Sequence, residues 1–564
     1  MTDTAVDARR THPLNDAPLN PKGGYVLYWM QQSQRVHANH ALDLAIEQAD
    51  TLRLPVVVVF GLTTAYPEAN WRHFAFMLQG LAEVDQELAR MGIVMHIAAG
   101  SPPDVALTVG RDAALIVCDR GYLRHQRNWR ADLAARSACR VIEVESDAIV
   151  PVELASNKAD FAARTFRPKI NRHLPEFLEP TGPVPPPQKS SLGLFDRSDV
   201  SRLAGRLTVD RSVQPATPLL EGGCSKALII LDKFIEKNLS HYTDRRHKVE
   251  NQSTSQLSPY LHFGQISPLR VALSIQQADA PEDTKVAFLE ELIVRRELAI
   301  NHVWFNPHYD AYEGLPAWAR RTLADHASDE RRPIYDDEIL EAAQTHDPYW
   351  NTCMQEMRAT GTLPGYLRMY WGKKILQWQP TPQQAFATAL RLNNRYFLDG
   401  RDPNSYAGVG WLFGLHDRPW QERPIYGQIR YWRVPVSSEN LTCGVTSTAP
   451  CDASPKSLSG DDPTGYTGKP CAAPARALSR RRVVDLFQGG ENLRFVQRRV
   501  VFNRHGFGLD VALNGFDAVE FLEFSLDRAG TMTAGNIGNM KSLFRHDDLP
   551  FCSTGLFPNR FPIV

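Results

Sequence analysis

Residues 55–60 have the sequence PVVVVF, in which four consecutive β-branched valines lie between a proline and an aromatic residue. A short run that is apolar at every position is typical of a strand that is buried on both faces. Such strands occur in parallel sheets that are covered by helices on both sides. The run therefore predicts an α/β fold in this part of the chain.

The segments around this run continue the same pattern. Further apolar runs with strand character occupy residues 25–29 (YVLYW), 93–98 and 114–118. Between PVVVVF and the next run, apolar residues from Phe74 to Leu88 recur at helical spacing, and Gly92 suits the position just beyond a helix. This alternation predicts a Rossmann-like α/β domain over residues 24–150, with ligands bound at the carboxyl ends of its strands. No GxGxxG or P-loop motif follows these runs, so neither a nicotinamide nor an ATP site is indicated.

The composition divides the rest of the chain into three parts. Residues 151–222 are predicted to be an interdomain connector, which contains the proline-rich text EPTGPVPPPQ at 179–188. Residues 223–432 are predicted to form an all-helical domain. Its clearest helices are expected at residues 224–238, 285–301, 336–345, 366–378 and 382–392. All 11 tryptophans lie at or before Trp432, and residues 433–564 are an unassigned extension, either a disordered regulatory or DNA-binding tail or a misread stretch.

The charge balance and the cysteines limit the function classes. Lys+Arg and Asp+Glu both number 63, so any nucleic-acid site must be a local basic face. None of the 8 cysteines has the spacing of a zinc site, and we expect no metal. The N-terminus lacks the apolar core of a signal peptide, and no segment has the length and apolarity of a membrane span. We therefore expect a cytoplasmic protein of bacterial type that does not contact a membrane. We also expect it to be a monomer.

Residues 251–268, NQSTSQLSPYLHFGQISP, combine hydroxyl side chains with a predicted helix start. Hydroxyls and free backbone N–H groups at such a start can hold a diphosphate without using positive charge. The alternative is an ordinary Ser/Thr-rich N-cap, and the segment alone favours that alternative.

Other motifs follow this segment in a definite order. They are FLEELIVRRE at 288–297, THDPYWN at 345–351, YLRMYWGKKILQW at 366–378 and LNNRYFLDGRDPNSYAG at 392–408. Together they resemble the class II cyclobutane pyrimidine dimer photolyases of the photolyase/cryptochrome family, and the resemblance extends over residues 24–432. It implies a flavin enzyme that repairs ultraviolet-damaged DNA with light.

The resemblance implies FAD, active in its reduced form, as the cofactor. The residues that would hold the FAD phosphates are Tyr242, Thr254, Ser255, Leu257 and Ser258. Asn393 would face the flavin N5, and Arg368 and Asp399 would form an ion pair beside the isoalloxazine ring. A buried pair of this kind is costly to desolvate, so its expected value is electronic tuning. The sheet domain would hold an antenna chromophore, a deazaflavin or a folate.

The resemblance also implies a pocket for a dimer taken out of the base stack. Glu291 would contact the pyrimidine edges, provided that burial keeps it protonated; the alternative is a surface pair with Arg295 at i+4. Met369 and Trp411 would form apolar walls of the pocket. Arg246 and Trp411 would contact the damaged DNA, and the neighbouring pair Lys373–Lys374 would add to a local basic face.

Trp350, Trp371 and Trp378 match the family's aromatic chain for photoreduction of the flavin. Trp371 and Trp378 lie seven residues apart on one predicted helix, so they share a face at about 10 Å of axial rise. The alternative is ordinary core packing, which explains most helical aromatic residues.

Three features depart from the family pattern. Pro364 replaces a histidine, the loop between Trp411 and His416 is one residue shorter than in some members, and 132 residues follow Trp432. These features favour an alternative, a cryptochrome-like blue-light photosensor with a signalling tail. A third reading is a flavin- or nucleotide-binding module without photochemistry. The presence of Glu291, Met369 and Trp411 favours repair.

Overall fold

The computed structural model describes residues 6–180, 182, 185–217, 219–246, 253–432, 509–512 and 519–522. The described residues up to Trp432 belong to one compact unit. In a second unit, β7 (Leu509–Ala512) pairs with β8 (Val519–Leu522) in antiparallel orientation. The other residues of the 433–564 extension lie outside the described residues.

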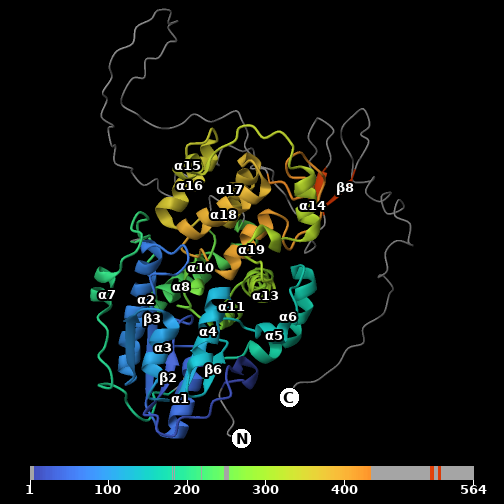
Figure 1. The fold of residues 1–564 in the computed structure, drawn as a ribbon. Coiled ribbons are helices and arrows are strands. Elements are labelled where there is room, and N and C mark those ends of the chain that lie inside the picture. Colours follow the sequence, from blue (N-terminus) through green and yellow to red (C-terminus); the bar gives the residue numbers. More distant parts are fainter. Residues whose placement is uncertain are drawn as a thin grey trace, which may run out of the picture. The chain divides into compact units, whose positions relative to one another are not determined.

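The first unit begins with a six-stranded sheet in the order β1-β6-β5-β2-β3-β4 (Figure 1). The strands are β1 (Thr11–Pro13), β2 (Tyr25–Trp29), β3 (Val56–Leu62), β4 (Val94–Ala99), β5 (Ala113–Asp119) and β6 (Val141–Val144). All neighbours are parallel except β1 and β6. This confirms the predicted α/β domain, to which the structure adds the short strands β1 and β6.

Helices cover both faces of this sheet, as the PVVVVF run requires. They are α1 (His40–Leu52), α2 (Trp71–Arg90), α3 (Pro102–Gly110) and α4 (Arg124–Arg136). In β3, Val56 and Val58 pack with the apolar residues of α1 and α2, whereas Val57 and Val59 pack with those of α3 and α4. All four valines are fully buried, and burial of each stabilises the fold by about 1.5 kcal/mol or more.

The connector follows the edge of the sheet. Ser191 Oγ accepts a hydrogen bond from the backbone N–H of Val94 at 2.8 Å, and Ser198 Oγ accepts one from Ile97 at 2.7 Å. These side chains satisfy β4 backbone groups that would otherwise form an open sheet edge. Downstream, α5 (Val152–Ala155), α6 (Ala163–Phe177) and α7 (Val200–Arg206) complete this region.

The rest of the unit is helical, as predicted. Its α-helices are α8 (Cys224–Lys237), α9 (Tyr242–Arg245), α10 (Ser258–His262), α11 (Pro268–Gln277), α12 (Glu282–Leu289), α13 (Arg296–Phe305), α14 (Ala317–Asp325), α15 (Asp337–Ala342), α16 (Pro348–Thr360), α17 (Gly365–Trp378), α18 (Pro382–Tyr396) and α19 (Pro403–Leu412). The single helix expected at 285–301 is interrupted by a π-helical stretch, η4 (Glu290–Arg295). Pro364 precedes the first residue of α17, where a proline costs no helical hydrogen bond. Within the described part of the chain, no helix has the length and apolarity needed to cross a bilayer.

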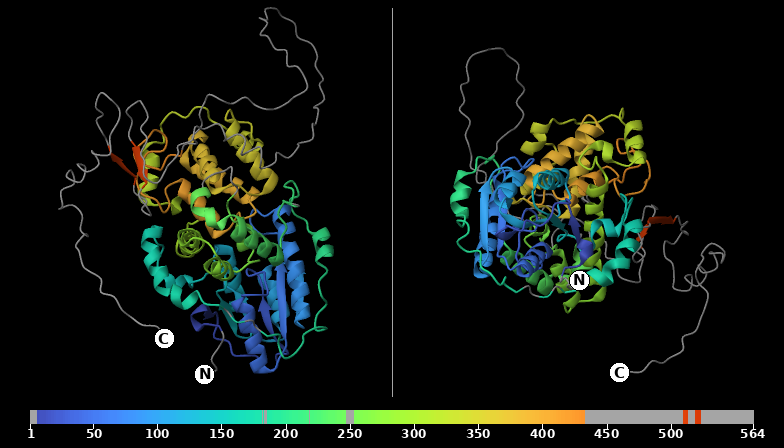
Figure 2. Two further views of the ribbon diagram at one scale, coloured as in Figure 1. Left: turned by 180° about the vertical axis from the view of Figure 1, so that it is seen from behind. Right: turned by 60° about the horizontal axis from the view of Figure 1, so that its bottom comes forward.

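The buried Arg72 connects the sheet region to the helical region, which lie against each other in both views of Figure 2. From the start of α2, its guanidinium donates to the carbonyl oxygens of Met357 at 3.1 Å and Tyr396 at 2.7 Å, and also to that of Arg358. These carbonyls lie at the C-terminal ends of α16 and α18. Burial lowers the pKa of Arg72 to about 10, so it still carries a positive charge where helix dipoles favour one.

Candidate functional site

The three tryptophans of the predicted aromatic chain lie together in the core of the helical region. Each is at most 1% exposed. Trp350 comes from α16, its ring centroid is 5.6 Å from that of Trp378, and its indole N–H donates to the backbone carbonyl of Trp371 at 2.9 Å. Trp350 therefore connects the two tryptophans of α17.

Aromatic contacts continue beyond both ends of this series. On one side, the ring of Trp371 lies 6.2 Å from that of Phe397. On the other side, Trp378 contacts Tyr335 edge-on at 5.4 Å, and Tyr335 is partly exposed. Tyr335 was not predicted as a site residue, because it belongs to a loop and carries no helical spacing. The five rings lead from the interior of the helical region to its surface.

The predicted ion pair between Arg368 and Asp399 forms at the inner end of this series. Arg368 Nη2 lies 3.0 Å from both carboxylate oxygens of Asp399. The guanidinium also lies 3.9 Å above the centroid of the Phe397 ring, and its Nε donates to the carbonyl of Leu363 at 2.9 Å. The side chains are 22% and 11% exposed, so the pair is largely desolvated and held in one orientation.

Asn393 lies in α18 and is 5% exposed. Its Nδ2 donates to Oδ1 of Asn394 at 3.1 Å. Among the described residues, none donates a hydrogen bond to the side-chain oxygen of Asn393. Asn393 thus has an acceptor available for a ligand.

The residues expected to hold the phosphates differ in their exposure. Tyr242 and Leu257 are buried, and Tyr242 packs edge-on against Phe288 with ring centroids 5.4 Å apart. Thr254 and Ser258 are exposed, and Ser255 is partly exposed. The apolar members therefore belong to the core, while the hydroxyls remain accessible to a diphosphate. Together with the acceptor of Asn393 and the Arg368–Asp399 pair, this arrangement fits FAD.

Glu291 lies in the π-helical stretch η4, a type of irregularity that is frequent at functional sites. Its carboxylate accepts a hydrogen bond from Arg246 Nη1 at 3.0 Å, so the two residues expected at the lesion contact each other. The expected alternative, a pair with Arg295, is wrong, because Arg295 pairs with Glu290 instead at 3.3 Å. The burial expected for Glu291 is wrong, since its side chain is 45% exposed.

The two predicted apolar walls come from packed helices. Met369 lies in α17 and Trp411 in α19, and both side chains are partly exposed. The helices approach closely at Gly372, where a Cβ atom would come within 2.2 Å of Leu412 Cδ1. A larger residue at this position would force the buried Leu412 side chain to move, next to Trp411 in α19.

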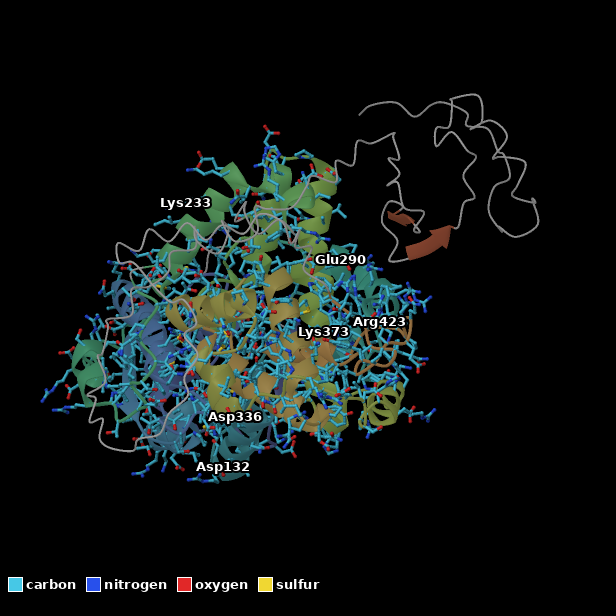
Figure 3. All side chains as sticks on the ribbon, turned by 90° about the horizontal axis from the view of Figure 1, so that it is seen from above. Asp132, Lys233, Glu290, Asp336, Lys373 and Arg423 are labelled. Atoms are coloured by element: carbon cyan, nitrogen blue, oxygen red, sulfur yellow. The ribbon has the colours of Figure 1, made fainter. Side chains whose placement is uncertain are left out.

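Lys373 (labelled in Figure 3) is not part of a basic face, contrary to expectation. It is 3% exposed, and its ammonium group donates to the carbonyl of Leu412 at 2.5 Å, at the C-terminal end of α19. Burial lowers its pKa to about 7. Lys374 is more exposed and lies 3.7 Å from Asp347. Lys373 thus supports the end of the helix that carries Trp411.

We expect Lys373→Met to change how stability depends on pH. The folded pKa of about 7 lies below the ordinary value of 10.5, so between these values the unfolded chain binds a proton that the folded chain does not. The free energy of unfolding therefore gains up to about 1.4 kcal/mol per pH unit as the pH rises through this range. Urea unfolding from pH 7 to 10 should show a flatter profile in Lys373→Met. Lys374→Met is the matched control, and equal profiles in all three proteins would contradict the expectation.

A basic and aromatic group follows α19. The guanidinium groups of Arg418 and Arg430 lie 4.9 and 4.8 Å from the ring centroid of Trp420. The indole N–H of Trp420 donates to Asp417 at 3.1 Å. This group could not be predicted from the sequence, because Arg418 and Arg430 are isolated in a chain of zero net charge. The fold brings these two arginines, which lie 12 positions apart, to the same tryptophan.

A separate cavity lies at the carboxyl ends of β2 and β3, where ligands of doubly wound sheets bind. Its volume is about 60 Å³, smaller than the roughly 300–1,000 Å³ of typical small-molecule sites. Residues that line it include Gln31, Gln32, Thr63, Tyr66, Gln126 and Arg401. Close by, the buried Asp119 accepts hydrogen bonds from the backbone N–H groups of residues 31–33 and so fixes the loop after β2.

The chain is similar to known proteins over most of its length. A family model described as DNA photolyase matches residues 26–188. The chain is 46% identical over 427 residues to a deoxyribodipyrimidine photo-lyase of Methanothermobacter thermautotrophicus, covering 76% of this chain and 94% of that protein. It is 38% identical to a protein of the same name from Arabidopsis thaliana, covering 73% and 86%. A crystal structure of a bacterial class III photolyase from Agrobacterium tumefaciens has the same fold, with a TM-score of 0.58 at 20% identity, covering 72% of this chain and 82% of that one.

Proposed function

Because the chain belongs to the DNA photolyase/cryptochrome family, we propose that it is a class II photolyase that repairs cyclobutane pyrimidine dimers with light. Members of this family bind FAD, which in its reduced form would supply the electron that opens the dimer once the dimer is flipped out of the duplex. The observation that carries the proposal is the series of buried tryptophans that leads from the surface to the Arg368–Asp399 pair.

The residues of the helical region have separate roles in this proposal. Asn393 offers a hydrogen-bond acceptor to the flavin N5, and the Arg368–Asp399 pair lies beside the ring system. Backbone and hydroxyl groups bind the diphosphate without positive charge. The residues assigned to the phosphates are Tyr242, Thr254, Ser255, Leu257 and Ser258.

The lesion side combines apolar walls with a polar contact. Met369 and Trp411 exclude water from the flipped dimer, and Glu291 forms hydrogen bonds with the pyrimidine edges. The carboxylate of Glu291 accepts a hydrogen bond from Arg246 at 3.0 Å. We propose that entry of the dimer replaces this bond, which releases Arg246 for a phosphate of the damaged strand.

DNA affinity in this chain has to come from a local surface, since its formal net charge is zero. We propose that Arg246, Arg418 and Arg430 supply it, with Trp420 held between two of these arginines. Phosphate contacts of this kind bind without sequence preference, and their affinity falls as the salt concentration rises. We further propose that the sheet region holds an antenna chromophore, a deazaflavin or a folate, at the carboxyl ends of its strands.

The direct test uses purified, chemically reduced protein, a dimer-containing oligonucleotide and blue light. We expect a loss of dimers that depends on light. If the protein binds FAD but leaves the dimers intact, the proposal fails and the photosensor alternative, which the proline at position 364 favours, replaces it.

A substitution at Glu291 tests the assigned polar contact. Glu291→Ala should lower affinity for dimer-containing DNA and the rate of repair by about tenfold, because a hydrogen bond to the pyrimidines is lost. The matched control is Glu290→Ala, which alters a neighbouring carboxylate of the same π-helical stretch that is paired with Arg167. Equal losses in both variants would show that the effect comes from the helix and not from the contact.

A further inference from the structure

Asn394 connects Asn393 to the sheet region through hydrogen bonds of fixed direction. We propose that Asn394 is a positioning residue that keeps the side-chain oxygen of Asn393, and not its NH2 group, turned toward the flavin N5. The inference rests on the proposed function, because Asn393 has its place at N5 only there. The assignment of Asn393 to N5 does not say whether its oxygen or its NH2 group faces the flavin, and Asn394 decides between the two.

The orientation of Asn394 is set at both ends of its amide group. Its Oδ1 accepts from the backbone N–H of Arg401 at 3.0 Å, and a backbone N–H can only donate. Its Nδ2 lies 2.5 Å from Oε2 of Glu68, a carboxylate oxygen that accepts. Burial raises the pKa of Glu68, but a protonated carboxyl group still retains an acceptor oxygen. If the amide of Asn394 were flipped, its NH2 group would face the backbone N–H of Arg401, and two donors would oppose each other.

This orientation determines that of Asn393. The group of Asn393 that faces Asn394 Oδ1 at 3.1 Å has to be Nδ2, since an oxygen there would face another acceptor. The carbonyl oxygen of Asn393 is then turned the other way. The residue is 5% exposed, but its oxygen is not enclosed in the core, so a ligand that donates a hydrogen bond can reach it.

The direction of the Asn393 amide matters because flavin N5 carries a hydrogen only when the ring is reduced. A carbonyl oxygen beside N5 accepts from that N–H and opposes the lone pair of the oxidised ring. An NH2 group would instead donate to the lone pair of the oxidised ring and oppose the N–H of the reduced ring. The fixed amide therefore favours the reduced cofactor, the form that repair requires.

The two partners of Asn394 are themselves held in unusual backbone conformations. Glu68, between β3 and α2, has φ of 57°, and Arg401, after α18, has φ of 65°. Residues other than glycine persist in this left-handed region only where their surroundings hold them. Arg401 also donates from Nη1 to the carbonyl of Asn394 at 2.9 Å. Two strained positions thus converge on one asparagine.

The test measures the flavin, not repair. Asn394→Ala should retain FAD, shift the midpoint potential to more negative values and speed the dark oxidation of the reduced protein in air by about threefold to tenfold, as expected for one lost hydrogen bond. Glu68→Ala should act in the same direction. Glu68→Gln, which keeps an acceptor oxygen, should stay close to wild type, as should Asn404→Ala, which alters an exposed asparagine of α19.

A double variant separates positioning from a general structural effect. If Asn394 acts through Asn393, then Asn393→Ala and the double variant Asn393→Ala/Asn394→Ala oxidise at the same rate. Multiplied effects, or an unchanged rate in FAD-bound Asn394→Ala and Glu68→Ala, would overturn the inference and leave the proposed function standing. Wild-type protein that takes up no FAD would refute the proposed function itself.

Discussion

Trp350→Phe should lose most of the light-driven reduction of bound FAD. Trp350 is the only tryptophan of the described series that contacts both of the others, through the 5.6 Å ring contact with Trp378 and the hydrogen bond to Trp371. Phenylalanine fills much of the space but is far harder to oxidise, and it has no N–H to donate. We expect the rate to fall at least about tenfold, which corresponds to about 1.4 kcal/mol on the barrier. The measurement is the decay of flavin absorbance under blue light with an external reductant.

Two controls distinguish a broken relay from a damaged protein. Chemically reduced Trp350→Phe should still repair dimers in light, because in the proposed function the series reduces the flavin and takes no part in splitting the lesion. Trp129→Phe, a change in α4 of the sheet region, should photoreduce normally. If Trp350→Phe photoreduces like the wild type, electrons do not pass through this series.

Asp399→Ala should cause the largest loss of stability and of cofactor. It leaves the guanidinium of Arg368 without its carboxylate while the Phe397 ring and the Leu363 carbonyl hold it in place. Breaking a buried pair costs about 3–5 kcal/mol, and we expect the lower part of this range because Arg368 is 22% exposed. Urea unfolding of the FAD-free protein measures this loss, and flavin absorbance after gel filtration measures the cofactor that is retained.

The chain offers a matched comparison for this ion pair. Glu330 and Arg332 form a pair whose side chains are 69% and 84% exposed, so Glu330→Ala should change stability by less than about 1 kcal/mol. Asp399→Asn keeps an acceptor oxygen and should fall between wild type and Asp399→Ala. A loss in Asp399→Ala no larger than that in Glu330→Ala would contradict the role of the desolvated pair.

The sheet could be predicted where its strands are long and apolar. PVVVVF gave β3 directly, because every side chain of a doubly covered strand is buried. The strands β1 and β6 have only three and four residues, and such runs have no reliable pattern. Residue spacing also did not reveal the π-helical stretch at Glu290–Arg295, because a single wider turn shifts the apolar pattern by only about one residue within a short helix.

The site could be predicted in part, for a similar reason. Seven-residue spacing placed Trp371 and Trp378 on one face of α17, but only the fold brings Trp350 between them from α16. The contact between Glu291 and Arg246 could not be predicted from spacing, because Arg246 lies 45 residues away in sequence. Local spacing gives the order of residues on one helix, whereas contacts between helices depend on tertiary packing.

Arg72 has a consequence for exchanging parts between relatives. Its side chain extends from the first turn of α2 and binds the carbonyl ends of two helices, one of which carries Trp350 and the other Asn393. A chimera that takes its sheet region from another protein must therefore bring an arginine at this position. Without it, the carbonyl groups at the ends of α16 and α18 would lose their donor, and the helices that carry Trp350 and Asn393 would be less firmly held.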